Sequence, residues 1–381
     1  YILAVAIFGL GSLVVSFAHD TTMLLAGRAI QGFGSSGIFP VAIATIGDVF
    51  PVEKRGRALG LIGAVFGIAF ILGPFIAGIM LRYFEWNALF LINIPVAIAL
   101  IIFSARLLPA TRLETKQDID WAGIIIMAVI LTSFTLALNN IDTHQIADSL
   151  GSWSVLPFLL IVFLLTPFLL KLELYQKEPV LNVKLFNSRQ VRVVGFIAFG
   201  LGLFQSSIVF LPKLAVDLFG VEPSRASFML LPVVVATAIG SPLGGRLVDK
   251  IGSKVIIITG LVIASVALIL FSMLTRNVLL FYIAEACLGF GLSMRASLNY
   301  IMLNEVPAIE RASTQGILVI FISIGQLAGA ALVGAISAAT PGKTNGFGFA
   351  FLVMTFISAA LVGLAFLLKN RKEELEGNKL I

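Results

Sequence analysis

The sequence predicts an all-α membrane protein that crosses the bilayer about 12 times, each crossing a helix of about 20 residues. Of its 381 residues, 59% are hydrophobic and only 12% are charged, whereas a typical soluble domain has about 25% charged residues. The hydrophobic residues form runs of about 20, long enough to cross a hydrocarbon core of about 30 Å. Most charged residues lie in the gaps between these runs. These observations exclude an ordinary soluble enzyme.

Twelve apolar runs are expected to form the membrane-spanning helices, because each is bounded by charged residues or by glycine and proline. In chain order they cover residues 1–18, 22–48, 57–81, 86–106, 119–138, 153–171, 191–212, 225–247, 254–274, 278–304, 311–339 and 347–369.

Lysine and arginine are distributed unequally between alternate gaps. Nineteen of the 26 lie in or next to the gaps after the second, fourth, sixth, eighth and tenth spans or in the tail after the twelfth. Only five lie on the other side, and the last two, Arg28 and Arg295, lie inside spans. Basic residues accumulate in the cytoplasmic loops of membrane proteins. The sequence therefore predicts a multi-pass protein of the plasma membrane with a cytoplasmic C-terminus. Because the basic residues are explained by this topology, the net charge of +6 does not indicate a nucleic-acid partner.

Two segments of the chain resemble each other. Residues 28–34 of the second span align with residues 285–291 of the tenth, and residues 50–55 align with 306–311 at nearly the same offset. Both copies lie in spans of the same topological sense, so the repeat is parallel. Parallel halves related by an axis along the membrane normal are one of the known transporter architectures. We therefore predict two pseudo-symmetric helical halves.

Several motifs resemble those of the major facilitator superfamily. Three of them are similar to its loop motif, its fourth-helix motif and its fifth-helix antiporter motif: Gly245-x-Leu247-x-Asp249-Lys250-x-Gly252-Ser253-Lys254, Leu24-x-x-x-Arg28-x-x-Gln31-Gly32-x-Gly34, and Gly63-x-x-x-Gly67 with Gly73-Pro74-x-x-Ala77-Gly78. Three more resemble the fourteen-span drug:proton antiporters of the EmrB/QacA type: Glu85-Trp86-Asn87 with Phe90-x-x-Asn93-Ile94-Pro95, Asp120-Trp121-Ala122-Gly123, and Glu178-Pro179 with Leu185-Phe186. The sequence departs from these patterns at Ala77, Asn87 and Ser253.

The resemblance implies the major facilitator fold, with an extra helix pair inserted between two six-helix halves. We expect residues 1–106 to form an incomplete N-terminal half, 107–188 a linker with the two extra helices, 189–369 the C-terminal half and 370–381 a cytoplasmic tail. The first-half counterpart of the loop motif would fall before residue 1. We therefore expect the first two spans of a fourteen-span parent to be absent from this chain.

Three charged side chains, those of Arg28, Glu285 and Arg295, fall inside predicted spans. An ionised side chain at mid-bilayer costs about 2.5–3.5 kcal/mol on insertion scales, so each requires a role. Gln31 shares a helical face with Arg28, and Asn299 lies near the face of Arg295 and Glu285. We interpret the two polar stripes as walls of a central cavity in which Glu285 takes a proton or meets a cationic substrate. The alternative is a structural ion pair, such as Glu285 with Arg295.

Gln205 in the seventh span is assigned to the same proton-coupling and substrate cavity. An interhelical hydrogen bond is the alternative role for such a polar group in an apolar run.

Two further groups of residues are expected to matter for gating. The resemblance implies that the third span bends and seals the halves against leakage, although plain close packing of small residues is the alternative. The residues of this antiporter-motif helix are Gly63, Gly67, Gly73, Pro74 and Gly78. The resemblance also implies that Asp249 pairs with basic groups to hold the cytoplasmic face closed, and a solvated charge is the alternative. The residues of this gating loop are Gly245, Asp249, Lys250 and Gly252.

No motif for an enzyme or a metal site is found. Gly342-Lys343-Thr344 lacks the first glycine of a phosphate-binding loop, no nucleophile elbow is present, and His19 and His144 belong to no cluster with metal-ligand spacing. We therefore predict that the protein is not an enzyme. Glu285, the glycine- and proline-containing third span and the resemblance to drug:proton antiporters together imply a proton-coupled exporter of lipophilic or cationic drugs that works by alternating access. It would need no cofactor except the proton gradient.

Two other functions are compatible with the sequence. One is a major facilitator carrier of one specific, possibly anionic, metabolite. The other is a membrane scaffold or sensor that transports nothing. For the transporter, the expected partners are a small-molecule substrate, protons and the lipid bilayer, and the chain is expected to be a monomer.

Overall fold

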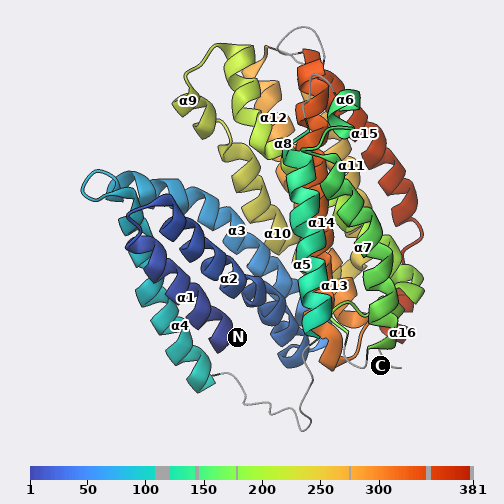
Figure 1. Cartoon of the computed structure of the whole chain (residues 1–381). Helices are drawn as coiled ribbons and strands as arrows, with labels where there is room; N and C mark the ends of the chain where they lie inside the picture. Colours follow the sequence, from blue (N-terminus) through green and yellow to red (C-terminus); the bar gives the residue numbers. More distant parts are fainter. Residues whose placement is uncertain (108–119, 142–145, 177–178, 274–275, 340–344, 378–381) are drawn as a thin grey trace.

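The computed structural model is built from helices (Figure 1) and shows no strand in the residues that it describes, which are all except 108–119, 142–145, 177–178, 274–275, 340–344 and 378–381. The helices, in order, are α1 (Ile2–Ser16), α2 (Thr21–Val49), α3 (Val52–Met80), η1 (Trp86–Ile92), α4 (Asn93–Leu107), α5 (Trp121–Asn139), α6 (Ile146–Leu150), α7 (Leu156–Tyr175), η2 (Val183–Asn187), α8 (Arg189–Phe219), α9 (Pro223–Phe228), α10 (Leu231–Ile251), α11 (Ser253–Ser272), α12 (Val278–Leu292), α13 (Arg295–Asn304), η3 (Ala308–Glu310), α14 (Arg311–Ala339), α15 (Asn345–Ala365) and α16 (Arg371–Gly377).

Each of the twelve predicted spans corresponds to one helix or to two consecutive helices. Within the described residues, ten segments are long and apolar enough to cross a membrane. Of the other two predicted spans, α1 is apolar but has only 15 residues, and α3 has 29 residues with four charged ones close to its start. The predicted fold class, an all-α multi-pass membrane protein, is confirmed.

The helices form two groups that face each other (Figure 1). In the first group, α1 packs against α2, α4 and η1. In the second group, α8 packs against α14, and α11 packs against α12 and α15. The groups meet where α3 packs along α10, α2 packs against α14, and α13 packs against α3. The helices α5 and α7 form a separate pair, in which α5 contacts α14 of the second group and α7 contacts η2.

The two ends of the bundle are named here after the helices found there. The α16 end is the one at which α16 and the start of α3 lie, and the α9 end is the opposite one (Figure 1). A small apolar cluster joins the two groups and includes Ile43 of α2, Leu59 of α3, Val248 of α10 and Tyr300 of α13. Leu59 and Tyr300 are almost completely buried, so this cluster holds the two groups together.

Local sequence explains where several helices begin and end. Asp20 accepts a hydrogen bond from the Met23 amide (2.7 Å) and Asn277 accepts one from the Leu279 amide (2.9 Å), which are the N-cap interactions that short polar side chains favour. Gly220 ends α8 in the left-handed conformation (φ 64°), and Gly252 separates α10 from α11 (φ 90°). Glycine adopts positive φ without steric cost.

Glycines let the backbones of α3 and α10 touch. A Cβ atom on Gly60 would lie 2.6 Å from the carbonyl oxygen of Ser241, and one on Gly245 would overlap the backbone of Gly56 and Gly60. Close approach of helices through small residues is typical of membrane proteins, where no hydrophobic effect drives helices together. The contact between the two groups therefore depends on these glycines.

We predict that Gly60→Ala lowers the melting temperature of the purified protein. The added methyl group must push α10 away, and such overpacking costs about 1–3 kcal/mol, more than the roughly 1 kcal/mol gained from the higher helix propensity of alanine. The matched control is Gly316→Ala in α14, where a Cβ atom would meet nothing within 4 Å. An unchanged or raised melting temperature for Gly60→Ala would contradict the close contact.

Candidate functional site

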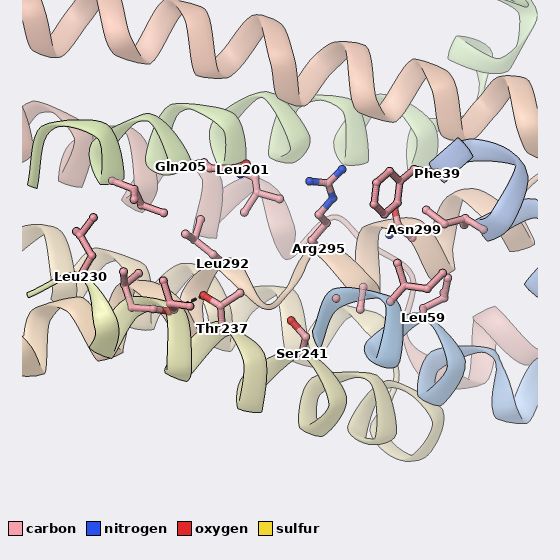
Figure 2. A pocket seen from close by; sticks show the side chains of 17 residues that line it. Phe39, Leu59, Leu201, Gln205, Leu230, Thr237, Ser241, Leu292, Arg295 and Asn299 are labelled. Carbon is pink, nitrogen blue, oxygen red and sulfur yellow. Dashed lines mark hydrogen bonds between the residues drawn. The ribbon is translucent and has the colours of Figure 1, made fainter. Parts of the chain in front are cut away.

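A cavity of about 120 Å³ lies between the two groups of helices. Its walls come from α2 and α3 on one side and from α8, α10, α12 and α13 on the other. Most of the lining is apolar, and the side chains labelled in Figure 2 include Phe39, Leu59, Leu201, Leu230 and Leu292. Binding sites for small molecules are commonly cavities of this kind, apolar with a few polar groups that set orientation.

The polar lining of the cavity comes from the second group of helices. It consists of Gln205 on α8, Thr237 and Ser241 on α10, and Arg295 and Asn299 on α13. The Thr237 hydroxyl donates to the carbonyl oxygens of Val233 (2.8 Å) or Gly289 (3.2 Å). Within the described part of the chain, the side-chain amides of Gln205 and Asn299 have no hydrogen-bond partner. They are therefore available to a bound molecule.

Arg295 is the one charged residue among the described residues that line the cavity. In Figure 2 its guanidinium group points into the space between Leu201 and Phe39. The residue lies at a break in the helix, because α12 ends at Leu292 and α13 begins at Arg295. The N-terminus of a helix carries a partial positive charge, so the helix end and the guanidinium group both favour negative charge in this part of the cavity.

Some of the lining residues were assigned to a cavity from the sequence and others were not. The sequence assigns Gln205, Arg295 and Asn299 to a cavity, and the structure places all three in this one. Thr237, Ser241 and Phe39 also line it and were not singled out. Thr237 and Ser241 are four residues apart in an apolar span, and this shared helical face is the signal that identifies them.

Glu285 does not line this cavity. Its side chain is in α12 with 0% exposure, and neither carboxyl oxygen has a hydrogen-bond partner among the described residues. The alternative suggested by the sequence, an ion pair with Arg295, is therefore not formed. Burying an ionised carboxylate without a partner is strongly unfavourable, so the neutral acid is the stable form at this position.

Arg28 and Gln31 also lie away from the cavity. Arg28 donates to the Gln31 side chain (2.7 Å), and Gln31 donates to the Ser12 hydroxyl (2.8 Å). Ser12 also accepts from Asn93 (3.2 Å), and the Arg28 guanidinium lies 5.8 Å from the centre of the Phe90 ring. This network connects α2 to α1, α4 and η1. The two predicted polar stripes are therefore not brought together.

The glycine-rich part of α3 is only partly described. Gly63 faces α10, where an added Cβ atom would lie 2.6 Å from that of Ser241, whereas Gly73 has no atom within 4 Å of the position of its missing Cβ. For Gly67, Pro74 and Gly78 the structure describes the helical backbone but not the burial of the residue.

Asp249 of the predicted gating loop connects the two groups at the α16 end. Its carboxylate accepts hydrogen bonds from the backbone amides of Gly56 and Arg57 near the start of α3, each 2.8 Å long. The resemblance implied pairing with basic groups. In the structure the hydrogen-bond partners of the carboxylate are main-chain N–H groups, and Arg371 of α16 lies close enough to interact with it electrostatically. Lys250 is exposed.

Two arginines add further contacts between the groups at the same end. Arg311 of α14 forms an ion pair with Asp48 of α2 (2.5 Å) and donates to the carbonyl oxygen of Gly47 (2.9 Å). Arg55 of α3 donates to the Asn304 side chain and to the same carbonyl oxygen of Gly47 (2.5 Å). Together with Asp249, these contacts close the α16 end.

The last helix, α16, packs against the gating loop. Arg371 donates to the Tyr300 hydroxyl (2.8 Å) and to the carbonyl oxygen of Asp249 (2.7 Å). Glu374 accepts hydrogen bonds from the amide and the hydroxyl of Ser253. Burial raises the pKa of Glu374, while its hydrogen bonds to Ser253 and its proximity to Arg371 act in the opposite direction.

Comparison with known proteins identifies relatives along most of the chain. The sequence model of the Major Facilitator Superfamily matches residues 1–234 and 192–380. The uncharacterized MFS-type transporter YfiU of Bacillus subtilis (strain 168) is 31% identical over 85% of this chain and 64% of its own length. The multidrug transporter protein MdtP of the same organism is 31% identical over 90% and 64%. The riboflavin transporter RibZ of Clostridioides difficile (strain 630) is 27% identical over 78% and 63%.

The chain thus spans less than two thirds of the length of these relatives. Among solved structures, the human organic anion transporter MFSD10 (TETRAN) matches with a TM-score of 0.67 at 15% identity, covering 94% of this chain and 76% of the other. At this identity, the similarity supports the fold.

We predict that Asp249→Ala opens the contact between α3 and α10 at the α16 end. The variant removes two hydrogen bonds to an ionised acceptor, a kind of bond worth about 1.5–3 kcal/mol each. The measurement is the yield of a disulfide between cysteines placed at Arg57 and Lys250, after Cys287 has been replaced by alanine. The yield should fall in Asp249→Ala and stay constant in Glu53→Ala, which removes an exposed carboxylate from α3. Equal yields in the two variants would contradict the role of Asp249.

Proposed function

Because the chain belongs to the Major Facilitator Superfamily, we propose that it functions as a secondary active transporter of small molecules that works by alternating access. The observation that carries this proposal is the cavity between the two helix groups, together with the contacts that close the α16 end. For the cavity to open at that end, the bonds of Asp249 and Arg311 to the first group must break. Reversible contacts of this kind are what an alternating-access transporter requires.

The finer classification belongs to the same proposal. We assign the chain to the fourteen-span drug:proton antiporters, with the pair α5 and α7 as their extra helices. We also propose that the α16 end faces the cytoplasm of the plasma membrane. The concentration of lysine and arginine at this end supports that orientation.

We propose that Glu285 carries the coupled proton. The side chain is completely buried in α12 and has no partner for either oxygen. A buried acid that is neutral when sealed and ionises when water reaches it can take up a proton in one conformation and release it in the other. Since Glu285 lies outside the cavity, proton and substrate would bind at separate places and influence each other through α12 and α13.

Two substrate classes remain as candidates. The apolar lining favours lipophilic molecules, as expected for an exporter of drugs, and one relative is named a multidrug transporter. The presence of Arg295 favours the second candidate, a carrier of an anionic solute with an apolar part. A cationic substrate would meet a like charge in this cavity, and no acidic residue is among the described residues that line it.

Glu285→Gln should abolish proton movement driven by the substrate and spare substrate exchange. Glutamine keeps the size of the side chain but cannot release a proton. Proteoliposomes containing the full chain and a pH-sensitive dye measure the proton flux, and exchange of labelled substrate at equal pH measures the uncoupled step. Glu222→Gln, at an exposed position, is the matched control. Proton flux unchanged in Glu285→Gln would rule out this residue as the carrier.

Arg295→Gln should abolish the charge preference of the cavity. The probes are 2-naphthoate and 2-naphthyltrimethylammonium, aromatic ions of similar size and opposite charge, and calorimetry measures their binding to the purified protein. We expect the native protein to bind the anion at least about tenfold more tightly, a difference of roughly 1.4 kcal/mol, and the variant to lose that preference. Tighter binding of the cation by the native protein would favour the drug exporter and contradict the anion carrier.

A further inference from the structure

The motif Asp120-Trp121-Ala122-Gly123 has no part in the proposed transport site, yet it forms a distinct structure at the start of α5. The Asp120 side chain is only 8% exposed. One of its oxygens, Oδ1, accepts hydrogen bonds from the Gly123 amide (2.9 Å) and from the Gln176 side chain (3.3 Å). Asp120 is thus the N-cap of α5 and also holds the segment that follows α7.

A second buried acid lies in the last turn of α7. Glu173 is 2% exposed, and its Oε2 atom accepts a hydrogen bond from the Leu181 amide (3.1 Å). This bond connects α7 to the segment that leads into η2 and α8. Each acid therefore uses one carboxyl oxygen to hold the chain around the helix pair.

The other oxygen of each acid has no hydrogen-bond partner in the part of the chain that the structure describes. These oxygens, Asp120 Oδ2 and Glu173 Oε1, are both buried. Both lie within 2.6 Å of the point that a Cβ atom on Gly123 would occupy, so the two oxygens are no more than about 5 Å apart. Any residue larger than glycine would collide with both carboxyl groups, which explains the glycine of the motif.

Two ionised carboxylates cannot both be stable at this separation when they are buried. Like charges that share a buried site force one acid to keep its proton. In the described part of the chain no cation pairs with either acid. On the neighbouring elements, Lys171 of α7 and Lys184 of η2 form no such pair, Glu310 of η3 accepts from Asn182, and Arg311 of α14 binds Asp48.

We propose that Asp120 and Glu173 bind one proton between them, at a site in the α5–α7 pair that is separate from Glu285 and from the cavity. A proton needs only the two free oxygens, whereas a metal ion such as calcium requires six or more oxygen ligands. The proton allows the two acids to stay buried while their other oxygens hold α5, α7 and the segment after α7 together. The site does not depend on the proposed transport function.

The test is infrared spectroscopy of the full chain in proteoliposomes at pH 7, where a protonated carboxyl group has its own carbonyl band. Asp120→Asn and Glu173→Gln should each shift or remove the same single band, because the proton loses one of the two oxygens that share it. The double variant should remove that band and affect no other. Asparagine still caps a helix and glutamine keeps the size of glutamate, and Glu222→Gln at an exposed position should change nothing.

Three results would overturn the proposal. They are two bands that are each altered in a different variant, no band altered in either variant, and a band in the native protein that disappears when sodium or potassium is added. A second measurement, the dependence of the melting temperature on pH, does not use the single variants. Folding that takes up this proton makes the folding equilibrium fall up to tenfold per pH unit, from the pKa of the unfolded acids, about 4, up to the pKa of the shared proton in the folded protein. The double variant, if folded, should show a shallower decrease of melting temperature with pH than the native protein, and an equal slope would contradict the site.

The outcome of these two measurements does not bear on the proposed transport function. Loss of the shared proton in Asp120→Asn should leave coupling through Glu285 intact, and failure of Glu285→Gln to change proton flux would leave the Asp120–Glu173 site unchanged. The two proposals can therefore fail independently.

Discussion

The backbone contact between α3 and α10 is the interaction on which the rest of the structure depends. Gly56 and Gly60 of α3 and Gly245 of α10 allow it, and it fixes how the two helix groups face each other. The same contact brings the Asp249 carboxylate to the amides near the start of α3. The cavity lies beside the same contact, because Leu59 and Gly63 of α3 and Ser241 of α10 also line it.

The sequence alone predicts much of the fold because the bilayer imposes simple rules. An apolar run of about 20 residues must form a helix that satisfies its own backbone, so the positions of the spans follow from composition. Helical periodicity also identifies polar faces, but it does not say which neighbouring helix each face meets. Arg295 and Asn299 turn toward the cavity. Glu285, one helix earlier, turns into the core of the second group. Arg28 contacts Gln31 on its own helix and Phe90 of η1. The helix break at Ser293 and Met294 separates the two environments, and no residue pattern predicts it.

The buried polar groups of the chain are divided among separate places with different chemistry. The cavity holds a cation and amides among apolar side chains. The core of the second group holds Glu285, whose carboxyl oxygens have no hydrogen-bond partner among the described residues. The pair α5 and α7 holds two acids around one glycine. In a bundle with little water inside, each place has to balance its own charge, so a change of protonation at one of them reaches the others only through movement of helices.

The partners of Asp249 have a further consequence for the evolution of this contact. Main-chain N–H groups are present in every residue except proline, so the side chain at position 57 can vary without loss of the hydrogen bond. A substitution there needs no compensating change at position 249. Correlated substitutions across related sequences would therefore reveal the ion pair between Asp48 and Arg311 more readily than the contact of Asp249, even though both connect the same two groups of helices.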